Sequence, residues 1–398
     1  MDSYLLDWAN LLLRWAHVIV AIAWIGSSFY FVFLDNSLTP PDDPELKAKG
    51  VGGELWAVHG GGFYHPQKYP VAPKSLPPHL HWFFWESYST WLTGFGLFTV
   101  LYLFNASSFL IDKSVHAWSP GVAIATALGF LVVFWIVYDA VCRTLGRGPR
   151  GDAIVGAVVA GVVVLAAWLA CQLFAGRAAF LLVGAMMATA MSANVFFWII
   201  PGQKTVIAQI KAGQPVDPIH GQRGKQRSVH NTYFTLPVLI AMLSNHYGWL
   251  YQGPHNWLVL VALMLAGALI RHSFVARHKA LVQGRRVPWE HAVIGCLLLL
   301  GLAVWLAPAP RPAVAAGAPV PTLAQVQAVV AQRCVLCHGE QVQQKNVALH
   351  TPELLRQHAQ AVYQQVAVLK LMPLNNATQI TDEERGLVKR WFEARAQD

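Results

Sequence analysis

Long apolar runs, separated by polar segments, fill the first three quarters of the chain. They lie at about 10–34, 83–104, 119–141, 153–174, 179–200, 233–251, 256–275 and 289–307. Each run is long enough to cross roughly 30 Å of hydrocarbon as a helix. The pattern therefore predicts an all-α fold in which eight transmembrane helices form a bundle in a lipid bilayer.

The composition agrees with a membrane protein. Hydrophobic residues make up 55% of the sequence and charged residues 12%, whereas about 25% of the residues of a soluble domain are charged. A cleaved signal peptide is the alternative for the first run. That run is too long, however, and it has neither a cationic start nor a small-residue cleavage site. We therefore expect it to be the first helix of the membrane domain.

Basic residues are unevenly divided between the segments that join the runs. If the N-terminus lies outside, 17 basic residues fall on the inner side, in 35–82, 142–152, 201–232 and 272–288 with the adjacent Arg271, and three fall outside. Basic residues favour the cytoplasmic side of a membrane. We therefore expect an inner-membrane protein of a bacterium, with its N-terminus and C-terminal segment in the periplasm. This bias explains the net charge of +9 without a nucleic-acid partner.

A haem-attachment motif, C-x-x-C-H, runs from Cys334 to Cys337 and His338. In this motif the two thiols bond covalently to the haem vinyl groups and the histidine binds the iron. Met372 is the only methionine after residue 322 and is the expected sixth ligand. Zinc would need two further ligands at comparable spacing, which the segment lacks. The motif therefore predicts one covalent haem c with the His/Met ligation of electron-transfer cytochromes.

The C-terminal part of the sequence predicts a small helical domain on a tether. Residues 308–321 are rich in proline and alanine, so we expect an extended linker that reaches on the order of 40 Å. Helical patterns follow at 323–331 and 353–369, and Thr381 with Glu384 forms a capping box at the start of a last helix. The predicted domains are a membrane domain (1–307), a linker (308–321) and a class I cytochrome c-like domain (322–398).

Two histidines lie on the predicted outer side of the membrane domain. His17 is about two turns into the first helix, and His246 is near the outer end of the sixth. Ionisable residues within a membrane are costly and usually functional. A histidine pair at equal depth on two helices is one way in which a bundle holds haem b, although two hydrogen-bonded core histidines are the alternative. We predict a haem b between His17 and His246.

The connection at 35–82 is 48 residues long and lies on the predicted inner side. Long loops in compact bundles are usually functional or disordered. This one combines a glycine run, which permits close backbone approach, with aromatic side chains and several histidines. It suits binding of a flat, polar, anionic heterocycle. The alternative is an aromatic belt at the membrane interface.

The sequence resembles the membrane-bound bacterial urate oxidases, also called urate hydroxylases, which join an eight-helix membrane domain to a C-terminal cytochrome c. The resemblance extends over essentially the whole chain. It is carried by the pattern from His17 to Tyr30, the run Gly60-Gly61-Gly62-Phe63-Tyr64-His65, the stretch His81-Trp82-Phe83 before Trp85-Glu86, the segments 194–203 and 228–237, and the haem motif.

The resemblance implies oxidation of urate to 5-hydroxyisourate at the cytoplasmic face, with water as the source of oxygen and no peroxide formed. The electrons would pass to haem c and then to a soluble cytochrome c or a terminal oxidase. Direct transfer across about 30 Å of membrane would be too slow, so a relay such as haem b is required. On this basis we assign proton transfer or anion binding to His65, Lys68, His81 and His230, stacking on the purine to Tyr64 and Trp82, and orientation of a histidine to Glu86.

Two other functions compete with urate oxidation. A quinol-oxidising electron-transfer subunit would have the cytochrome but no use for the long polar loop. A haem-dependent membrane enzyme of tetrapyrrole synthesis would have the first helix but would not need a tethered cytochrome c. Reduction of the c-type haem when urate is added to membranes distinguishes these functions.

The charge distribution generates a prediction about topology. Tags at the N-terminus and after residue 398 should both be accessible from outside intact cells, and a tag at residue 50 should be protected, because the basic segments stay in the cytoplasm. Accessibility of each tag to a membrane-impermeant label is the measurement. Labelling of residue 50 from outside would contradict the orientation and would remove the need for a relay.

Overall fold

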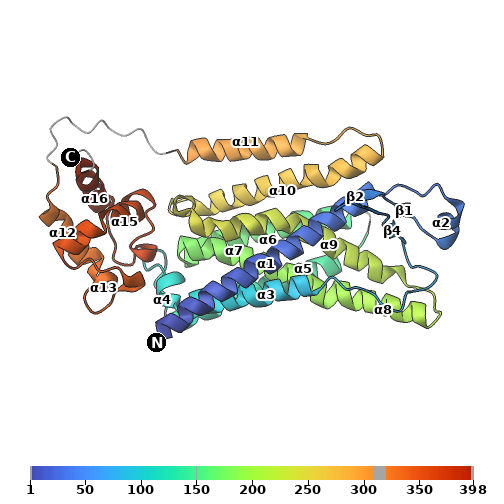
Figure 1. Ribbon diagram of the computed structural model, residues 1–398, viewed down its shortest axis with the longest axis horizontal. Coiled ribbons are helices and arrows are strands. Elements are labelled where there is room, and N and C mark those ends of the chain that lie inside the picture. Colours follow the sequence, from blue (N-terminus) through green and yellow to red (C-terminus); the bar gives the residue numbers. More distant parts are fainter. Residues whose placement is uncertain (1, 149, 308–319, 396–398) are drawn as a thin grey trace.

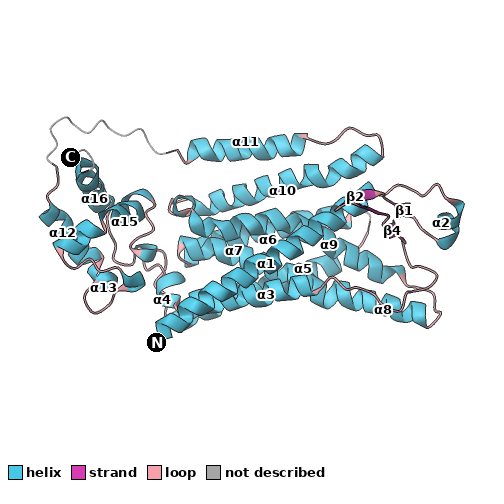
Figure 2. Ribbon diagram, in the orientation of Figure 1, coloured by secondary structure: helices cyan, strands magenta, loops and turns pink. Residues whose placement is uncertain are grey.

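The computed structural model describes residues 2–148, 150–307 and 320–395 of the chain. Most of these residues are helical. The long helices form one bundle, and a smaller helical domain lies at one end of it (Figures 1 and 2). The bundle helices are α1 (Asp2–Ser37), α3 (Trp85–Phe98), α5 (Pro120–Thr144), α6 (Gly151–Leu173), α7 (Gly176–Asn194), α9 (Pro218–Leu243), α10 (Asn256–Val282) and α11 (Glu290–Trp305).

Each of the eight apolar runs contains helix, but the helices differ in their suitability as membrane spans. Among the described residues, five are long and apolar enough to cross a bilayer: Tyr4–Ser37, Pro120–Thr144, Gly151–Leu173, Gly176–Lys211 and Asn256–Val282. The helix α3 has 14 residues and continues into a π-helical turn, α11 has 16, and α9 is polar in its first half. Several apolar helices are thus compatible with a membrane protein, and the count of eight spans remains a prediction.

Several shorter helical elements complete the bundle. They are the π-helical turns η1 (Thr99–Leu103) and η2 (Val195–Ile199), the helices α4 (Ala106–Phe109) and α8 (Ile200–Lys211), and the 3₁₀ turns η3 (Ser244–His246) and η4 (Gly248–Leu250). Most of the connection predicted at 201–232 is helical, because α7 continues through η2 into α8. Asp217 caps α9 by accepting a hydrogen bond from the backbone N–H of Ile219. Hydropathy marks only the apolar part of a helix, so these polar extensions were missed.

The helix α7 is the most buried element of the bundle and packs against α5, α6 and α9. Its buried residues are mainly small or flexible, which allows neighbouring backbones to approach closely. At Gly184, for example, an added Cβ atom would lie 2.8 Å from the Cβ atom of Ala241 in α9. Larger residues such as Phe180 and Met186 fill the remaining space and are fully buried. These contacts hold the polar side chains of α5, α7 and α9 in fixed positions.

The long connection folds into a small structure of its own. It contains α2 (Pro44–Lys49) and four short strands, β1 (Gly53–Glu54), β2 (Ala57–His59), β3 (Gly62–Tyr64) and β4 (Gln67–Lys68). The strands form two antiparallel pairs, β1 with β4 and β2 with β3. Gly60 and Gly61 connect β2 to β3 with φ angles of +59° and +80°, the positive values that a two-residue hairpin turn requires. These strands depart from the all-α prediction.

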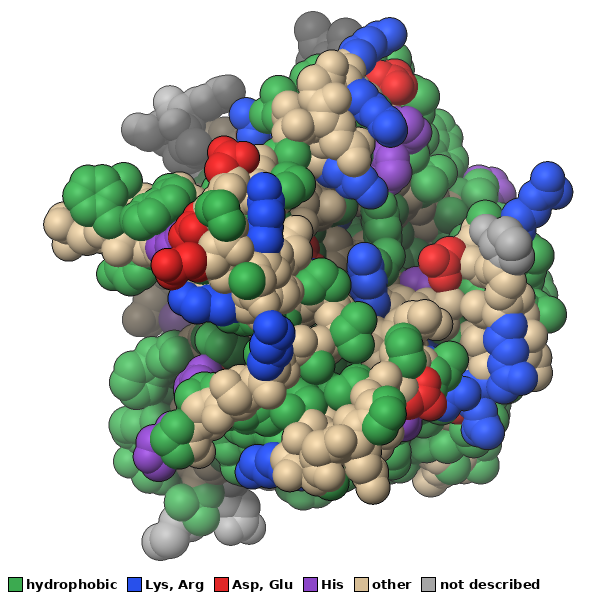
Figure 3. Space-filling model, turned by 90° about the vertical axis from the view of Figure 1, so that its right-hand side faces the viewer, with side chains coloured by type: hydrophobic (Ala, Val, Ile, Leu, Met, Phe, Trp, Pro, Cys, Tyr) green, Lys and Arg blue, Asp and Glu red, His purple; other side chains and the backbone are tan. Residues whose placement is uncertain are grey.

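This small structure lies at the end of the bundle opposite to the N-terminus and the C-terminal domain (Figure 1). Lysine and arginine side chains are spread over the same end (Figure 3). These basic side chains lie at the end of the bundle that the sequence predicts to be the inner one. Which end faces the cytoplasm remains a prediction.

The C-terminal domain has its own helices and its own core. Its elements are α12 (Leu323–Arg333), α13 (Val335–His338), η5 (Gln344–Asn346), α14 (Pro352–Gln357), α15 (Ala359–Val362), η6 (Tyr363–Val368), η7 (Leu374–Asn376) and α16 (Asp382–Arg395). Val326, Leu355, Val388 and Trp391 are among its buried core residues. Of the predicted linker 308–321, residues 308–319 lie outside the described residues.

The capping box predicted for the last helix is present. The backbone N–H of Thr381 donates to the Glu384 carboxylate (2.8 Å), and the backbone N–H of Glu384 donates to Oγ1 of Thr381 (3.2 Å). The same carboxylate accepts hydrogen bonds from the Arg333 side chain at 3.0–3.1 Å. Burial opposes the charge of Glu384, but these hydrogen bonds outweigh it and hold the pKa of the carboxyl below its usual value. The cap therefore also joins α16 to α12.

Candidate functional site

The predicted loop residues His65 and Lys68 each have an acidic partner. Nε2 of His65 lies 2.5 Å from Oε2 of Glu54, and the imidazole stacks on Trp56 with the ring centroids 4.0 Å apart. Nζ of Lys68 lies 2.6 Å from Oδ1 of Asp35 in a half-exposed ion pair. The loop is thus an ordered structure that orients an imidazole against a carboxylate, as a general base requires. Tyr64 is 52% exposed beside it.

The predicted residues at the start of α3 form a separate group. His81 is exposed and meets the ring of Phe83 edge-on at 4.6 Å, and Trp82 is partly buried. Oε2 of Glu86 is buried and has no hydrogen-bond partner among the described residues. The carboxylate that orients His65 is Glu54, and no hydrogen bond joins Glu86 to a histidine among the described residues. Pairing of β1 with β4 brings Glu54 to the histidine, and this pairing was not evident from the sequence.

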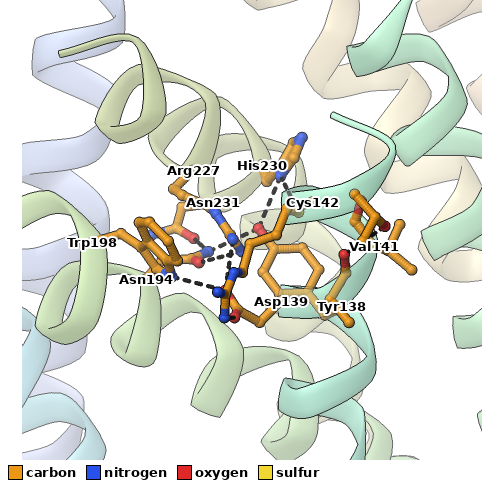
Figure 4. A network of polar contacts seen from close by, with 12 residues as sticks. Tyr138, Asp139, Val141, Cys142, Asn194, Trp198, Arg227, His230 and Asn231 are labelled. Carbon is orange, nitrogen blue, oxygen red and sulfur yellow. Dashed lines mark hydrogen bonds and ion pairs between the residues drawn. The ribbon is translucent and has the colours of Figure 1, made fainter. Parts of the chain in front are cut away.

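A buried ion pair lies between the central helices (Figure 4). Nη2 of Arg227 in α9 donates to Oδ1 of Asp139 in α5 at 2.6 Å, and the Arg227 side chain is 3% exposed. The indole Nε1 of Trp198 donates to the same oxygen at 2.8 Å. The guanidinium also lies 5.0 Å from the ring centroid of Tyr138 and 5.1 Å from that of Trp198. Close pairing and hydrogen bonding of this kind are needed to keep both charges in an apolar bundle.

His230 belongs to this buried network rather than to the loop (Figure 4). Its Nδ1 lies 2.8 Å from the Tyr138 hydroxyl, which accepts a hydrogen bond from the Asn194 amide at 2.9 Å. The amide also donates to Oδ1 of Asn231 at 2.8 Å. Since the hydroxyl oxygen accepts from Asn194, its own proton is free to be donated to Nδ1 of His230. Nε2 of His230 then carries the ring proton and can donate it to a hydrogen-bond acceptor.

The predicted catalytic residues thus fall into three places. His65, Lys68 and Tyr64 lie on the loop, His81, Trp82 and Glu86 lie at the start of α3, and His230 lies in the buried network. Among the described residues, no hydrogen bond or ring contact joins one group directly to another. Sequence reasoning missed Arg227 and Asp139. The signal for Asp139 was a carboxylate inside an apolar run, which is costly without a partner.

His17 has the hydrogen bonding that a metal ligand needs. Its Nδ1 lies 3.1 Å from the backbone oxygen of Thr90 and 3.0 Å from Oγ1 of Thr93, both in α3. A carbonyl acceptor on one ring nitrogen fixes the imidazole and leaves the lone pair of the other nitrogen for a metal. Gly94 lies against the ring, because an added Cβ atom there would come 2.9 Å from Cε1 of His17. The donor set at His17 therefore fits a haem iron.

His246 does not lie at the same depth as His17. It ends the 3₁₀ turn η3, beyond the C-terminal end of α9, and the adjacent Asn245 accepts a hydrogen bond from Tyr102 at 3.0 Å. Tyr102 is eight residues beyond Gly94, the neighbour of His17, which corresponds to a rise of about 12 Å along a helix. The equal depth expected for the two histidines is wrong, because α9 ends at Leu243 and not at the end of the apolar run. Among the described residues, no contact joins the two rings.

The C-x-x-C-H motif lies on α13 and the residue before it. Nδ1 of His338 lies 3.0 Å from the backbone oxygen of Val347, so this ring also has one nitrogen fixed and the other free. Burial raises the pKa of the Cys334 thiol to about 11, and the neighbouring Cys337 thiol adds to the shift. Among the described residues, no group of three or more His, Cys, Asp or Glu side chains is placed to hold a metal ion. The residues present fit a covalent haem better than zinc.

Met372 lies on a segment held by a buried arginine. Nη1 of Arg385 in α16 donates to the backbone oxygens of Val366 (2.6 Å) and Met372 (2.7 Å). Burial lowers the pKa of the Arg385 guanidinium, although not enough to discharge it at neutral pH. The Met372 side chain is partly buried and packs against the domain core. This arrangement suits an iron ligand whose position is set by the backbone.

The segment that carries Met372 contacts the bundle. Nε2 of Gln252, after η4, donates to the backbone oxygen of Lys370 at 2.7 Å, and Nδ2 of Asn375 donates to that of Ser108 at 2.6 Å. The contact is close at Gly248, where an added Cβ atom would lie 2.8 Å from Cδ2 of Leu371. A third polar contact is an ion pair of 2.6 Å between Nζ of Lys345 and Oδ1 of Asp7. We call these four contacts the docking surface.

The bundle, without the C-terminal domain, matches a known protein family. The family model described as urate oxidase N-terminal matches residues 3–307. The match covers more than half of the chain and ends before the C-terminal domain. No curated protein and no solved structure matches the chain.

The geometry around Met372 generates a prediction about the iron ligands. Met372→Ala should lower the haem reduction potential and abolish the weak methionine-to-iron absorption band, because it opens the sixth position. Redox titration and the visible spectrum of the purified protein are the measurements. His350, whose Nδ1 is buried without a hydrogen-bond partner in the described part of the chain, and His358 are the competing ligands. An unchanged band and potential would assign the iron to one of them.

Proposed function

The chain belongs to the urate oxidase N-terminal family, and on this basis we propose that it oxidises urate to 5-hydroxyisourate and passes the electrons to its own haem c. The family match carries the first half of the proposal. The second half is supported by the C-x-x-C-H motif, which follows the matched region in the same chain. Oxidation of urate by two electrons requires an acceptor, and an attached cytochrome supplies one.

The proposed reaction is balanced without dioxygen. Urate and one water molecule give 5-hydroxyisourate, two protons and two electrons. The oxygen atom of water forms the new C–O bond, and the two protons leave from water and the purine. Because electrons leave through a cytochrome and not through dioxygen, no hydrogen peroxide is formed. The electrons leave one at a time, since a haem iron accepts one electron per reduction.

Proton removal in this scheme falls to an imidazole of the loop. We propose His65, which Glu54 orients, as the base, and His230, which Tyr138 orients, as a hydrogen-bond donor to the substrate through its Nε2–H group. His81 and Lys68 are proposed for anion binding, and the exposed ring of Tyr64 and the partly buried ring of Trp82 for stacking on the purine. The basic end of the bundle favours approach of an anionic substrate.

Transfer of electrons along the bundle requires an intermediate carrier. We propose that His17 binds the iron of a haem b, since the Thr90 carbonyl orients its ring and leaves one nitrogen free. Such a haem would accept and release single electrons. His246, two residues before Gly248 of the docking surface, is proposed to act nearer to the cytochrome domain. We further propose that the bundle spans the bacterial inner membrane with the docking surface in the periplasm.

Urate-dependent reduction of the c-type haem tests the proposed function. Urate added to anaerobic membranes that contain the protein should reduce the haem, with the α band of the reduced cytochrome as the readout. Under air, 5-hydroxyisourate should accumulate without an equivalent amount of hydrogen peroxide. Cys334→Ala with Cys337→Ala is the control that removes the acceptor. A haem that ascorbate reduces but urate does not would refute the proposal.

A pair of glycine variants tests whether the docking surface carries the electrons. Gly248→Leu should displace Leu371 and lower the rate of urate-dependent haem c reduction about tenfold or more. Overpacking of a tight contact costs roughly 1–3 kcal/mol, and about 1.4 kcal/mol corresponds to a tenfold change in the docked population. Stopped-flow absorbance is the measurement. Reduction by ascorbate should be unchanged, because the haem itself is untouched.

Gly253→Leu is the matched control for this experiment. It adds the same side chain five residues away, where an added Cβ atom would have no neighbour within 4 Å. This variant should behave like the natural protein. Equal rates for the Gly248 and Gly253 variants would show that electrons reach the cytochrome by another route.

A further inference from the structure

A buried arginine in α10 lacks the hydrogen-bond partners that its charge requires. Arg271 is 7% exposed, and its guanidinium lies 3.7 Å from the ring centroid of Phe29 in α1. Neither Nε nor Nη2 of Arg271 has a hydrogen-bond partner among the described residues. In the same part of the chain, no carboxylate forms an ion pair with it. A buried cation of this kind is costly unless something absent from the polypeptide completes its contacts.

The other buried arginines show how the chain compensates such charges. Arg227 is paired with Asp139 and also donates to Asn194. Arg385 donates to two backbone oxygens. Arg271 is therefore exceptional among the three. Stacking on Phe29 gives the flat face of the Arg271 guanidinium a favourable contact. It supplies no hydrogen-bond acceptor to the N–H groups on the edge of the guanidinium.

The two nitrogens of Arg271 that lack partners are placed to donate hydrogen bonds to two neighbouring acceptor atoms of one ligand. Nε and Nη2 lie on the same edge of a guanidinium and direct two nearly parallel N–H bonds outward. This edge matches a planar anion that presents two acceptor atoms side by side. A urate monoanion has such a pair, because its deprotonated ring nitrogen lies next to a carbonyl oxygen. Lysine could supply only a point charge at this position.

Polar side chains from three helices lie near Arg271. The hydroxyl of Tyr233 in α9 lies 2.8 Å from Nδ1 of His272 in α10. The His272 ring meets that of His291 in α11 with the centroids 4.5 Å apart, and Nδ1 of His291 is buried without a partner in the described structure. The group around His272 therefore contains a second polar atom without a hydrogen-bond partner in the described structure.

Aromatic side chains of α1 contact both α10 and the start of α3. Phe31, two residues after Phe29 in α1, meets the ring of Phe83 with the centroids 4.9 Å apart, and Phe83 contacts His81 at 4.6 Å. Phe33 contacts the ring of His278 in α10 at 5.0 Å. The inner part of α1 thus lies between Arg271 and the start of α3.

We propose that Arg271 binds the purine anion through its Nε and Nη2 edge, with Tyr233, His272 and His291 forming the polar wall of the site. The inference rests on the proposed function and names the anion-binding residue for it. The phenol and the two imidazoles can donate to or accept from the remaining carbonyl and N–H groups of the purine. No carboxylate is required in the site, because the ligand itself carries the negative charge.

Binding and thermal unfolding of the full-length protein test the role of Arg271. Urate binding in detergent is measured by equilibrium dialysis under anaerobic conditions with the haem pre-reduced, so that no turnover occurs. Arg271→Gln should weaken binding at least about 30-fold, equivalent to roughly 2 kcal/mol. Arg271→Lys should give an intermediate loss, because the charge remains and the paired donors do not. Lys279→Gln, which removes a positive charge from an exposed site on the same helix, should bind like the natural protein.

The thermal midpoint separates ligand binding from a structural role. Without urate, Arg271→Gln should unfold at a temperature no lower than the natural protein, because an uncompensated buried charge has been removed. Saturating urate should raise the midpoint of the natural protein and not that of the variant. If Arg271 served only to pack on Phe29, the variant would be less stable without urate and would keep the urate-dependent shift.

The outcomes distinguish this inference from the proposed function. Urate binding by the natural protein together with unchanged binding by Arg271→Gln and Arg271→Lys would overturn the assignment of Arg271 and leave the proposed function standing. Absence of urate binding by the natural protein would overturn both. Should Arg271→Gln fail to fold, Arg271→Lys and Tyr233→Phe decide the question, since unaltered affinity in both would overturn the site.

Discussion

The ion pair between Arg227 and Asp139 is the interaction on which the arrangement of the central helices depends. The Arg227 side chain is buried and that of Asp139 is mostly buried, at 3% and 16% exposure, and loss of one partner from a buried pair costs roughly 3–5 kcal/mol. The pair joins α9 to α5, and Trp198 attaches η2 to the same carboxylate. Asn194 and Asn231 then follow in fixed positions between the helices. The orientation of His230 is a consequence of this network, because its partner Tyr138 lies within it.

The features predicted correctly from the sequence are those set by local chemistry or by the thickness of a membrane. Apolar runs located helices in all eight positions, because a helix that faces lipid must satisfy its backbone internally. The capping box at Thr381 depends on residues three apart and could be recognised directly. The motif at Cys334 is equally local, but haem attachment there remains a prediction; the structure shows only that Nδ1 of His338 lies 3.0 Å from the backbone oxygen of Val347.

The features that were missed depend on contacts between distant segments. Asp139 and Arg227 are 88 residues apart, and neither hydropathy nor spacing relates them. Glu54 meets His65 only because two-residue strands pair within the long connection, and such short strands give no alternating pattern. The depth of His246 was misjudged for a related reason. The apolar run continues past Leu243, whereas helix α9 ends at Leu243 and the chain then turns.

The docking surface affects the fraction of time for which the C-terminal domain contacts the bundle. Only twelve residues separate the last described residue of the bundle from the first of the C-terminal domain, and a short connection gives a tethered partner an effective concentration in the millimolar range. A surface made of three polar contacts and one close glycine contact is therefore sufficient to keep the domain docked for much of the time without binding it tightly. If the proposed function holds, weak docking of this kind would let one haem alternate between an internal donor and an external acceptor, so that the chain would act as its own shuttle.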